Sequence, residues 1–381
     1  MMGFAARAFR RRARITEGSR LPTIRDVAQH AGVAPSTVSY VFNGSRPISD
    51  ETRRRVQEAV DALGYHPRAS ARTLRSSRTH VIALALPRPA GRRNAVDGPF
   101  AIEISDAAVR LGYDLLLTTS QDKAEGLRRV ALSGLADAAV LMAVDMEDAR
   151  IDVVRELAFP AALIGRPADE DALPWTDLDW EEAAALVVSE LAAAGHREMV
   201  YLAPTKAEVV ARRSYALRGI AGATRGARST GAAVTVAHAV DDPAGLARRL
   251  RVLLAERADG GAGGRPTALI VQHPSAHHHI LTSVADAGLR IPEDLTVVVI
   301  GALPGDPAGR RLPRVELPVE TLAGEVTRLA VAAATALHET AAGDAEAGPR
   351  LLADAVGHLL IAPAMLPGDA PLTAPLTAPR A

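Results

Sequence analysis

The segment from Thr23 to Asn43 constrains the fold of this chain more than any other stretch. Its first half predicts a short helix, because apolar residues recur there at helical spacing, at Ile24, Val27, Ala28 and Ala31. Gly32 is suited to end that helix, since a left-handed residue is wanted at such a position. Pro35 fits the first turn of a second helix, where a missing backbone N–H costs nothing. The segment therefore predicts two short helices joined by a glycine-containing turn.

The second of these helices is expected to have two different faces. Apolar side chains point back toward a small core, at Val38, Val41 and Phe42. The outward positions carry small or hydrogen-bonding side chains, at Ser36, Thr37, Ser39 and Tyr40. A helix with a polar outer face suits insertion into the major groove of DNA, where base edges present donors and acceptors.

A third helix is expected directly after this pair. Asn43-Gly44 ends the second helix, and Ser49 followed by two acidic residues resembles a helix N-cap with an acidic first turn. The third helix is expected to run through residues 53–63 and to end at Gly64. The alternative interpretation is a small helical bundle without a role on DNA.

Over residues 23–75 the sequence resembles the LacI/GalR family of bacterial transcription regulators. The matching letters are T-I-x-D-V-A-x-x-A-G-V-x-x-S-T-V-S-x-V-x-N-G, then S-x-x-T-R-x-x-V, then L-G-Y-x-P, and finally A-R-x-L. So many fixed letters over about 55 residues form a specific signal, unlike one short motif taken alone. The resemblance implies a homodimeric repressor that reads the two halves of a near-palindromic operator.

The resemblance also implies particular DNA contacts. Ser36 and Tyr40 are expected to contact base edges, and Pro35 to touch a thymine methyl group. The family often has arginine at the position of Tyr40, and tyrosine lacks the paired donors with which arginine reads guanine, so the operator is expected to differ there. Contacts that set the register on the phosphates are expected from Thr23, Thr37, Asn43, Ser49 and Thr52, and Ser39 is a further candidate on the same face.

Residues 67–79 are expected to form a hinge after the helix-turn-helix domain. In the family this segment folds into a short helix on DNA, and a leucine from each subunit wedges into a base step of the minor groove. Leu74 stands at that position, with Arg68 and Ala71 as further candidate contacts. Wedging costs unstacking energy, but the resulting kink lets more protein contact the duplex. A passive polar linker is the alternative.

The charge of the chain is distributed unevenly, although its net charge is zero. Residues 1–80 hold 15 arginines and 6 acidic residues, a net charge of +9, which leaves −9 for the remainder. A basic amino-terminal part suits attraction to phosphate. Residues 1–20 lack the apolar centre of a secretory signal and are expected to be a disordered basic tail.

From residue 80 onward the pattern changes to alternating strands and helices. Residues 81–87 form a continuous apolar run, typical of a parallel strand buried on both faces. Further strands are expected at 114–119, 138–142, 161–165, 199–202, 234–237, 268–272 and 296–301, and helices at 101–111, 181–194 and 276–287. The alternation predicts an α/β fold of doubly wound parallel sheets, and the length suits two lobes.

This part resembles the effector-binding body of the same family, which is similar to periplasmic sugar-binding proteins. The resemblance is carried by Leu111-Gly112-Tyr113-Asp114, Leu163-Ile164-Gly165-Arg166, Gly195-His196-Arg197 and Gly288-Leu289-Arg290-Ile291-Pro292. In such folds the ligand lies between the lobes at the carboxyl ends of strands. The candidate cleft residues are Phe100, Gln121, Asp122, Arg166, Asp179, Arg213 and His273. Because carboxylates and guanidinium groups form paired hydrogen bonds, the expected effector is a sugar or another polar metabolite.

The second lobe departs from the family pattern in its polar residues. After the strand at 268–272 the family usually has Asn-Asp, whose aspartate often contacts the ligand, whereas this chain has His273-Pro274. The later Phe-Asp-Asp of the family is replaced by Ala302-Leu303-Pro304. The alternative function is therefore a ligand-independent dimeric regulator with a degenerate effector site.

Other kinds of chemistry find little support in the sequence. The chain has no cysteine, which excludes disulfides and thiolate chemistry and fits a reducing cytoplasm. No stretch approaches the roughly 20 uninterrupted apolar residues of a membrane span. His273 and His277 have a workable metal-ligand spacing, but no third ligand follows at a motif-like distance. Phosphate-binding and nucleophile motifs are absent, so neither an enzyme nor a cofactor is expected.

The expected organisation of the chain has five parts. Residues 1–20 are the basic tail, residues 21–66 the helix-turn-helix domain and residues 67–79 the hinge. Residues 80–365 form a two-lobed domain for effector binding and dimerisation. Residues 366–381, rich in Ala, Pro, Leu and Thr, are expected to be a disordered tail. The expected partners are double-stranded DNA, a small-molecule effector and a second copy of the chain, with no membrane.

Overall fold

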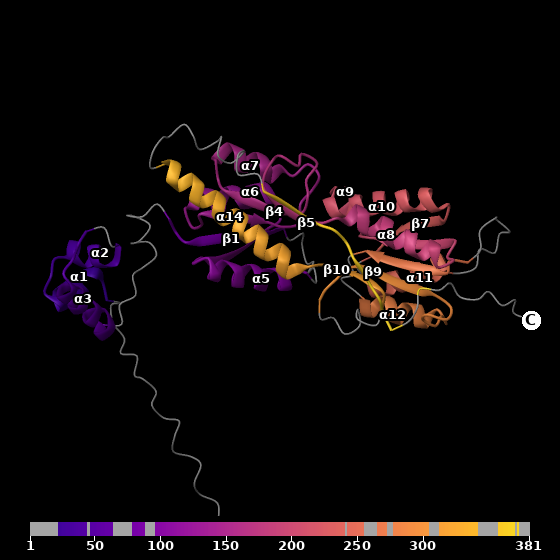
Figure 1. The fold of residues 1–381 in the computed structure, drawn as a ribbon, viewed down its shortest axis with the longest axis horizontal. Coiled ribbons are helices and arrows are strands. Elements are labelled where there is room, and N and C mark those ends of the chain that lie inside the picture. The colour runs from indigo at the N-terminus through magenta and orange to yellow at the C-terminus, as the bar shows by residue number, and fades with distance from the viewer. Residues whose placement is uncertain are drawn as a thin grey trace, which may run out of the picture. The chain divides into compact units, whose positions relative to one another are not determined.

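The computed structural model describes residues 22–43, 46–63, 78–87, 96–240, 242–254, 265–272, 277–304, 312–341, 357–369 and 372 (Figure 1). The chain divides into two compact units, and the boundary between them lies between residues 77 and 78. The hinge residues Arg68, Ala71 and Leu74, and the candidate ligand residue His273, lie outside the described residues.

The first unit is a bundle of three helices. They are α1 (Ile24–Ala31), α2 (Pro35–Asn43) and α3 (Asp50–Leu63). A small apolar core holds them together, made by Val27, Ala28, Ala31, Val38, Val56 and Ala59. The helix-turn-helix predicted from the apolar spacing is therefore confirmed.

The turn between α1 and α2 is fixed by one glycine and one arginine. Gly32 has a φ of 62°, so the left-handed residue expected at the end of α1 is confirmed. Arg55 reaches over from α3 and donates hydrogen bonds to the carbonyl oxygens of Ala31 and Gly32, at 2.5 and 3.3 Å. These bonds satisfy carbonyl groups that the end of a helix leaves without partners.

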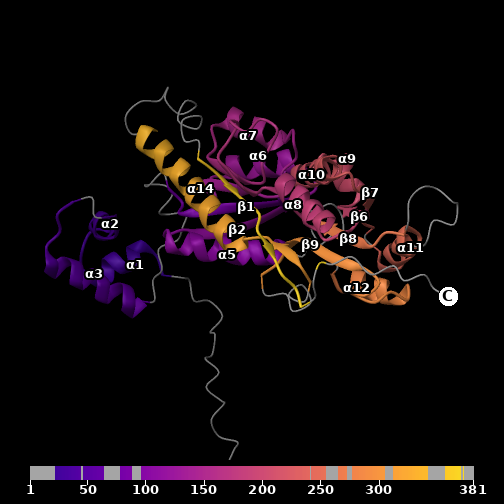
Figure 2. The same cartoon turned by 45° about the vertical axis from the view of Figure 1, so that its right-hand side comes forward.

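The second unit has two lobes, each a six-stranded sheet with helices on both faces (Figures 1 and 2). The sheet of the first lobe is parallel, with strand order β11-β5-β4-β3-β1-β2. Its strands are β1 (Val81–Pro87), β2 (Asp114–Ser120), β3 (Ala138–Leu141), β4 (Ala161–Ile164), β5 (Trp175–Leu178) and β11 (His358–Ile361). One face packs on α5 (Asp97–Arg110) and α14 (Val319–Ala341), and the other on α6 (Lys123–Ser133) and α7 (Ala149–Leu157).

The sheet of the second lobe has the order β12-β10-β9-β8-β6-β7 and is parallel except for the β10–β12 pair. Its strands are β6 (Glu198–Ala203), β7 (Ala233–His238), β8 (Ala268–Gln272), β9 (Thr296–Ala302), β10 (Arg314–Glu316) and β12 (Met365–Leu366). Its helices are α8 (Trp180–Ala193) and α10 (Ser214–Thr230) on one face, α11 (Pro243–Leu254) and α12 (His277–Asp286) on the other, and the short α9 (Lys206–Val210). The predicted α/β class with doubly wound parallel sheets is confirmed.

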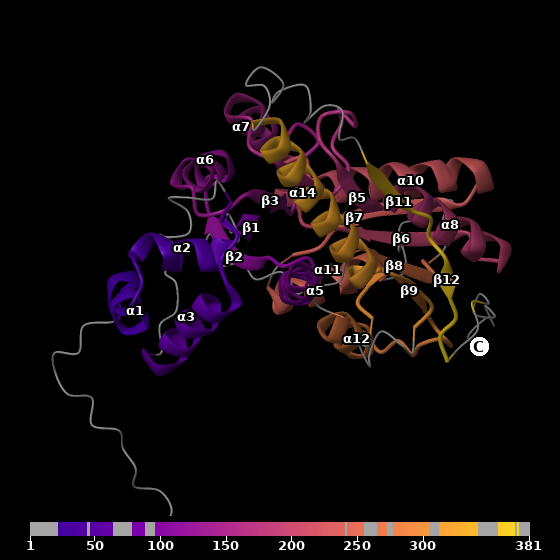
Figure 3. The same ribbon diagram turned by 60° about the vertical axis from the view of Figure 1, so that its left-hand side comes forward.

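The chain crosses between the two lobes three times (Figure 3). It leaves the first lobe after β5, returns before α14, and leaves again between β11 and β12. Strand β12 pairs with β10, and the carbonyl oxygen of Leu372 lies 2.9 Å from Nε2 of the buried His196. The prediction of a disordered tail from residue 366 is therefore wrong for residues 366–369 and 372, because short apolar segments within this Ala- and Pro-rich stretch pack on the second lobe.

Helices α8 and α10 lie very close together, because α10 has glycines at the contact. A Cβ atom on Gly222 would overlap the carbonyl oxygen of Glu181, and one on Gly226 would lie 2.9 Å from Cβ of Val188. The two Cβ atoms would thus lie closer to their neighbours than real Cβ atoms do. These positions therefore accept glycine alone at the present separation of the helices.

We expect Gly222→Ala to lower the free energy of unfolding by about 2–3 kcal/mol, because the added methyl group must push α8 and α10 apart. Gly324→Ala in α14 is the matched control, since no heavy atom lies within 4 Å of its Cβ position. That control should leave stability unchanged or raise it by up to about 1 kcal/mol. Urea denaturation followed by circular dichroism measures both variants, and equal stabilities would contradict the close packing.

Candidate DNA-binding surface and ligand cleft

The outer side of α2 presents the side chains expected to read DNA bases. Pro35 and Ser36 are exposed, and Thr37 and Tyr40 are partly exposed. Ser36 and Tyr40 lie one helical turn apart, so they share one side of α2. The guanidinium carbon of Arg46 lies 5.4 Å from the centre of the Tyr40 ring, a cation–π distance that places a positive charge beside this surface.

Ser39 does not belong to this outer surface. Its exposed fraction is 5%, close to that of the fully buried Val38 beside it. The prediction that Ser39 faces outward is wrong, because positions 38 and 39 both turn toward the bundle, where a small hydroxyl fits among apolar side chains. Of the expected inward residues, Val38 is confirmed, Val41 is half-buried, and the side chain of Phe42 lies outside the described residues.

Several residues expected to contact phosphates lie at helix N-termini. The N–H and the hydroxyl of Thr23 both donate to the Asp26 carboxylate at 2.7 Å, at the start of α1. Ser49 lies at the start of α3, where its hydroxyl accepts from the N–H of Thr52 at 3.3 Å. Helix N-termini attract phosphate through their free N–H groups and the helix dipole. The side chain of Asn43, at the end of α2, lies outside the described residues.

The second unit contains a cavity where its two lobes meet. Its volume is about 60 Å³, and it is partly open to solvent. The lining residues come from the ends of β3, β4 and β5, the first turns of α5, α8 and α10, and the entry to α14: Val96, Asp97, Phe100, Met142, Ala143, Val144, Ile164, Gly165, Asp177, Trp180, Ser214, Tyr215, Leu317 and Leu322. Open α/β sheets bind ligands at the carboxyl ends of their strands, which is where this cavity lies.

Only one of the expected cleft residues in the described part of the chain lines this cavity. That residue is Phe100, on the first turn of α5, and its exposed fraction is 2%. Arg213 lies next to the cavity rather than on its wall. It donates from one nitrogen to the carbonyl oxygen of Ala143 at 2.7 Å and to the Asp145 carboxylate at 2.5 Å.

The side chains of the other expected cleft residues in the described part of the chain do not line the cavity. Asp122 and Asp179 cap α6 and α8, each accepting from a backbone N–H at 3.0 Å. Gln121 is exposed beside Asp122. Arg166 lies between Glu170 at 3.7 Å and Asp179 at 3.9 Å, with its guanidinium carbon 5.9 Å from the centre of the Trp175 ring. The prediction of a polar cleft wall made by these side chains is not met.

A polar contact joins the lobes beside the cavity. The N–H of Ser214 donates to the carbonyl oxygen of Val144 at 3.0 Å, and the N–H of Met146 donates to that of Arg212 at 2.8 Å. Together with Arg213, these bonds connect the loop after β3 with the start of α10. We call this set of contacts, made by residues 144–146 and 212–214, the lobe contact.

A buried ionic cluster supports the lobe contact from within the first lobe. Lys123 lies 2.5 Å from the carboxylate of Asp145, and burial together with the guanidinium groups of Arg150 and Arg213 lowers its pKa to about 8. Burial would raise the pKa of Asp148, but its two hydrogen bonds from the Arg150 guanidinium, at 2.9 and 2.6 Å, hold that pKa well below the usual range. This cluster could not be predicted from the sequence, since its residues match no motif.

Asp177 is a buried carboxylate in the wall of the cavity and was also not identified from the sequence. It accepts from the N–H of Arg166 at 3.0 Å and from Nε1 of Trp180 at 2.9 Å. Burial raises its pKa to about 6, against these hydrogen bonds, which favour the ionised form. Its position at the end of the short strand β5 was the available signal, but that strand was not predicted.

The described part of the chain shows neither a metal site nor a membrane-spanning helix. No group of three or more His, Asp or Glu side chains there is arranged to hold a metal ion. No described helix is both long and apolar enough to cross a membrane.

Two protein-family models match this chain. The model for bacterial regulatory proteins of the lacI family matches residues 23–68, which include the three helices of the first unit. The model for a periplasmic binding protein-like domain matches residues 188–352.

Curated relatives match most of the chain at moderate identity. Catabolite control protein A of Priestia megaterium is 27% identical over 72% of this chain and 81% of its own length. The HTH-type transcriptional repressor PurR of Mannheimia succiniciproducens is 27% identical over 73% of this chain and 81% of its own length.

Solved structures match the fold of nearly the whole chain. The lac repressor dimer bound to operator and the anti-inducer ONPF has a TM-score of 0.72 at 20% identity, covering 91% of this chain and 98% of that one. The complex of the transcriptional regulator CelR with cellobiose has a TM-score of 0.60 at 21% identity, with the same coverage.

A helix-turn-helix unit joined to a two-lobed body of periplasmic-binding-protein type defines a class of DNA-binding transcription regulators. This chain belongs to the LacI family of those regulators.

Asp177 should make stability depend on pH between about 4 and 7. An unfolded aspartate has a pKa of about 3.9, so in this window the native state binds more protons, and stability falls as the pH rises. Asp177→Asn cannot titrate. We therefore expect wild type to lose about 2–3 kcal/mol relative to the variant between pH 4 and 7, measured by urea denaturation. Parallel pH profiles would show that Asp177 does not carry the raised pKa.

Proposed function

We propose that this protein is a cytoplasmic repressor that binds near-palindromic operator DNA as a homodimer, and that a small molecule bound between the lobes changes its affinity for that DNA. The observation that carries the proposal is the presence, in one chain, of a helix-turn-helix and of a cavity at the strand ends of a two-lobed body. The lac repressor and CelR structures support the two halves of the proposal, because the first is bound to operator and the second is a complex with cellobiose.

The DNA-reading surface is α2. Ser36 and Tyr40 contact base edges, and Pro35 touches a thymine methyl group. Phosphates are bound from the helix ends and the hinge by Thr23, Thr37, Asn43, Ser49, Thr52, Arg68 and Ala71. Leu74 enters a base step of the minor groove, as the family resemblance implies.

The dimer forms through the first lobe. Helix α5 exposes Ile102 and Val109, with exposed fractions of 63% and 64%, and these residues lie two turns apart on one side of the helix. Leu111 and Leu117, on the adjoining end of α5 and on the edge strand β2, are 42% and 52% exposed. Clustered apolar side chains on a surface helix and a neighbouring edge strand mark an interaction surface.

Effector binding reaches the DNA through the first lobe. Thr79, the last residue of the hinge, and His80, which follows it, donate backbone hydrogen bonds to the carboxylate of Asp137 at 2.6 and 2.8 Å. A ligand that changes the lobe contact therefore rotates the first lobe, and with it the end of the hinge, relative to the second lobe. Such a rotation orders or melts the hinge helix and couples the two sites by about 1–3 kcal/mol.

The alternative is a ligand-independent dimeric regulator. It is favoured by Gln272 at the end of β8, because the amide oxygen accepts from the hydroxyl of Tyr201 and the amide nitrogen donates to the carbonyl oxygen of Tyr215. If it holds, no small molecule will change the affinity for the operator.

Selection of bound DNA from a random pool, near physiological salt, tests the DNA-binding part. Wild type should enrich a near-palindrome, and Tyr40→Ala should lose base preference at one position of each half-site, at a cost of about 1–3 kcal/mol. Arg54→Ala, which breaks an exposed pair with Glu58 on α3, is the control and should keep the preference. An unchanged motif for Tyr40→Ala would remove Tyr40 from base reading, and no motif for wild type would refute sequence-specific binding.

The dimer surface is tested by Ile102→Asp. A buried charge at this position should raise the dissociation constant of the dimer by about 100-fold or more, as measured by analytical ultracentrifugation. The control Leu132→Asp, 69% exposed on α6, should leave the dimer intact. If both variants remain dimeric at the same concentrations, the dimer uses another surface.

A further inference from the structure

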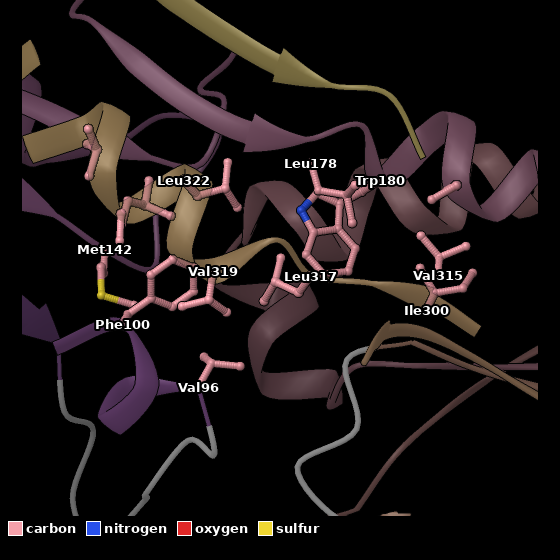
Figure 4. Close-up of a cluster of buried hydrophobic side chains, with 14 of the residues drawn as sticks. Val96, Phe100, Met142, Leu178, Trp180, Ile300, Val315, Leu317, Val319 and Leu322 are labelled. Carbon is pink, nitrogen blue, oxygen red and sulfur yellow. The ribbon is translucent and has the colours of Figure 1, made fainter. Parts of the chain in front are cut away.

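The walls of the cavity between the lobes are mainly apolar. Val96, Phe100, Met142, Trp180, Leu317 and Leu322 are each less than 8% exposed, and they come from α5, the end of β3, the start of α8 and the entry to α14 (Figure 4). Two aromatic rings extend the apolar wall on one side, because the centroids of Trp180 and Tyr215 lie 5.7 Å apart. Such walls favour an apolar ligand, because moving apolar surface out of water costs no hydrogen bonds and is favourable in free energy.

Asp177 of the first lobe and Ser214 of the second lobe, two polar side chains on the cavity wall, are engaged with the protein itself. Both oxygens of Asp177 accept hydrogen bonds, one from Arg166 and one from Trp180. The hydroxyl of Ser214, 1% exposed, donates to the carbonyl oxygen of Arg166. These contacts hold the wall in shape and use much of its hydrogen-bonding capacity.

The second lobe also directs its polar groups inward. The hydroxyl of Tyr215 donates to the carboxylate of Glu208 at 2.5 Å. Gln272, at the end of β8, accepts from the hydroxyl of Tyr201 at 2.9 Å and donates to the carbonyl oxygen of Tyr215 at 2.7 Å. The end of β8, directly before the positions at which the family usually has Asn-Asp, therefore holds an amide that is hydrogen-bonded to two tyrosines.

A sugar would be poorly accommodated in this cavity. Each sugar hydroxyl needs a donor and an acceptor, and each group buried without them costs about 1–3 kcal/mol. Anions are disfavoured too, because the charged side chains among the described lining residues are the acids Asp97 and Asp177, with no lysine or arginine among them.

We propose that the cavity binds a small molecule with an apolar, ring-containing body and no negative charge. This inference rests on the proposed function, since it names the chemical class of the effector at the same site. It replaces the sequence-based expectation of a sugar or another polar metabolite, which depended on the family resemblance rather than on these walls.

Isothermal titration of the full-length protein with three matched probes and one sugar tests the ligand class. The probes are 2-phenylethanol, 2-phenylethylamine and phenylacetate, which share one ring and differ in charge, and the sugar is cellobiose. We expect the alcohol and the amine to bind at least about tenfold more tightly than phenylacetate, and cellobiose to give no binding. Tighter binding of cellobiose or phenylacetate, or no binding of any probe, would overturn the proposal.

Two variants test whether the probes bind in this cavity. Val96→Phe adds volume to the wall and should weaken binding of 2-phenylethanol by at least about tenfold, whereas Val252→Phe, at a position 76% exposed on α11, should not. Asp97→Asn removes one negative charge from the wall and should bring the affinities of the amine and phenylacetate within about threefold of each other. Unchanged affinities in both cavity variants would place the binding elsewhere and overturn the proposal.

The outcome is separable from that of the proposed function. If the phenyl probes bind but leave the affinity for the selected DNA unchanged, the ligand class stands and effector control fails. If cellobiose changes the affinity for that DNA, effector control stands and the ligand class fails.

Discussion

The contact between Arg213 and the loop after β3 joins the two lobes, and the rest of the effector-binding body depends on it. One guanidinium nitrogen bonds both the carbonyl oxygen of Ala143 and the carboxylate of Asp145, while the flanking backbone pairs across the same boundary. This contact closes one side of the cavity and aligns the first turn of α10 with the end of β3.

The contact is polar, yet it is largely removed from water, so its charges must be compensated locally. Asp145 forms ion pairs with Arg213 and Lys123, and the neighbouring Asp148 forms an ion pair with Arg150. Burying any one of these charges alone would cost several kcal/mol. The cluster is therefore less a source of stability than a means of fixing one relative position of the lobes, and a ligand that favours another position must work against it.

The sequence predicted the DNA-binding unit well because its determinants are local. The spacing of Val27, Ala28 and Ala31, the left-handed Gly32 and the initial Pro35 each specify a nearby backbone conformation. Ser39 was the exception, since whether position 39 faces out or in depends on how α2 packs against its neighbours. Long apolar runs such as β1 and β9 were likewise predictable, whereas β5, β10 and β12 are too short to give a periodic signal.

The cleft was predicted less well, because its shape depends on contacts between distant segments. The rule that ligands lie at strand ends correctly brought Phe100 to the site, but it also selected Asp122 and Asp179, which cap helices instead. Asp177 and Tyr215 could be recognised as cavity residues only from the three-dimensional positions of β5 and α10. Sequence pattern can locate the edge of a sheet, but it does not show which polar groups there are already satisfied by the protein.

The three crossings between the lobes have a consequence for the order in which the protein is completed. The second lobe is an insertion within the first, because α14 and β11 follow it in the sequence and yet belong to the first sheet and its cover. During synthesis, the lobe that carries the hinge therefore lacks a strand and a long helix until the whole second lobe has been made and α14 and β11 have followed it. The DNA-binding unit, made before both lobes, is thus attached to a body that completes its fold only after β11 has emerged.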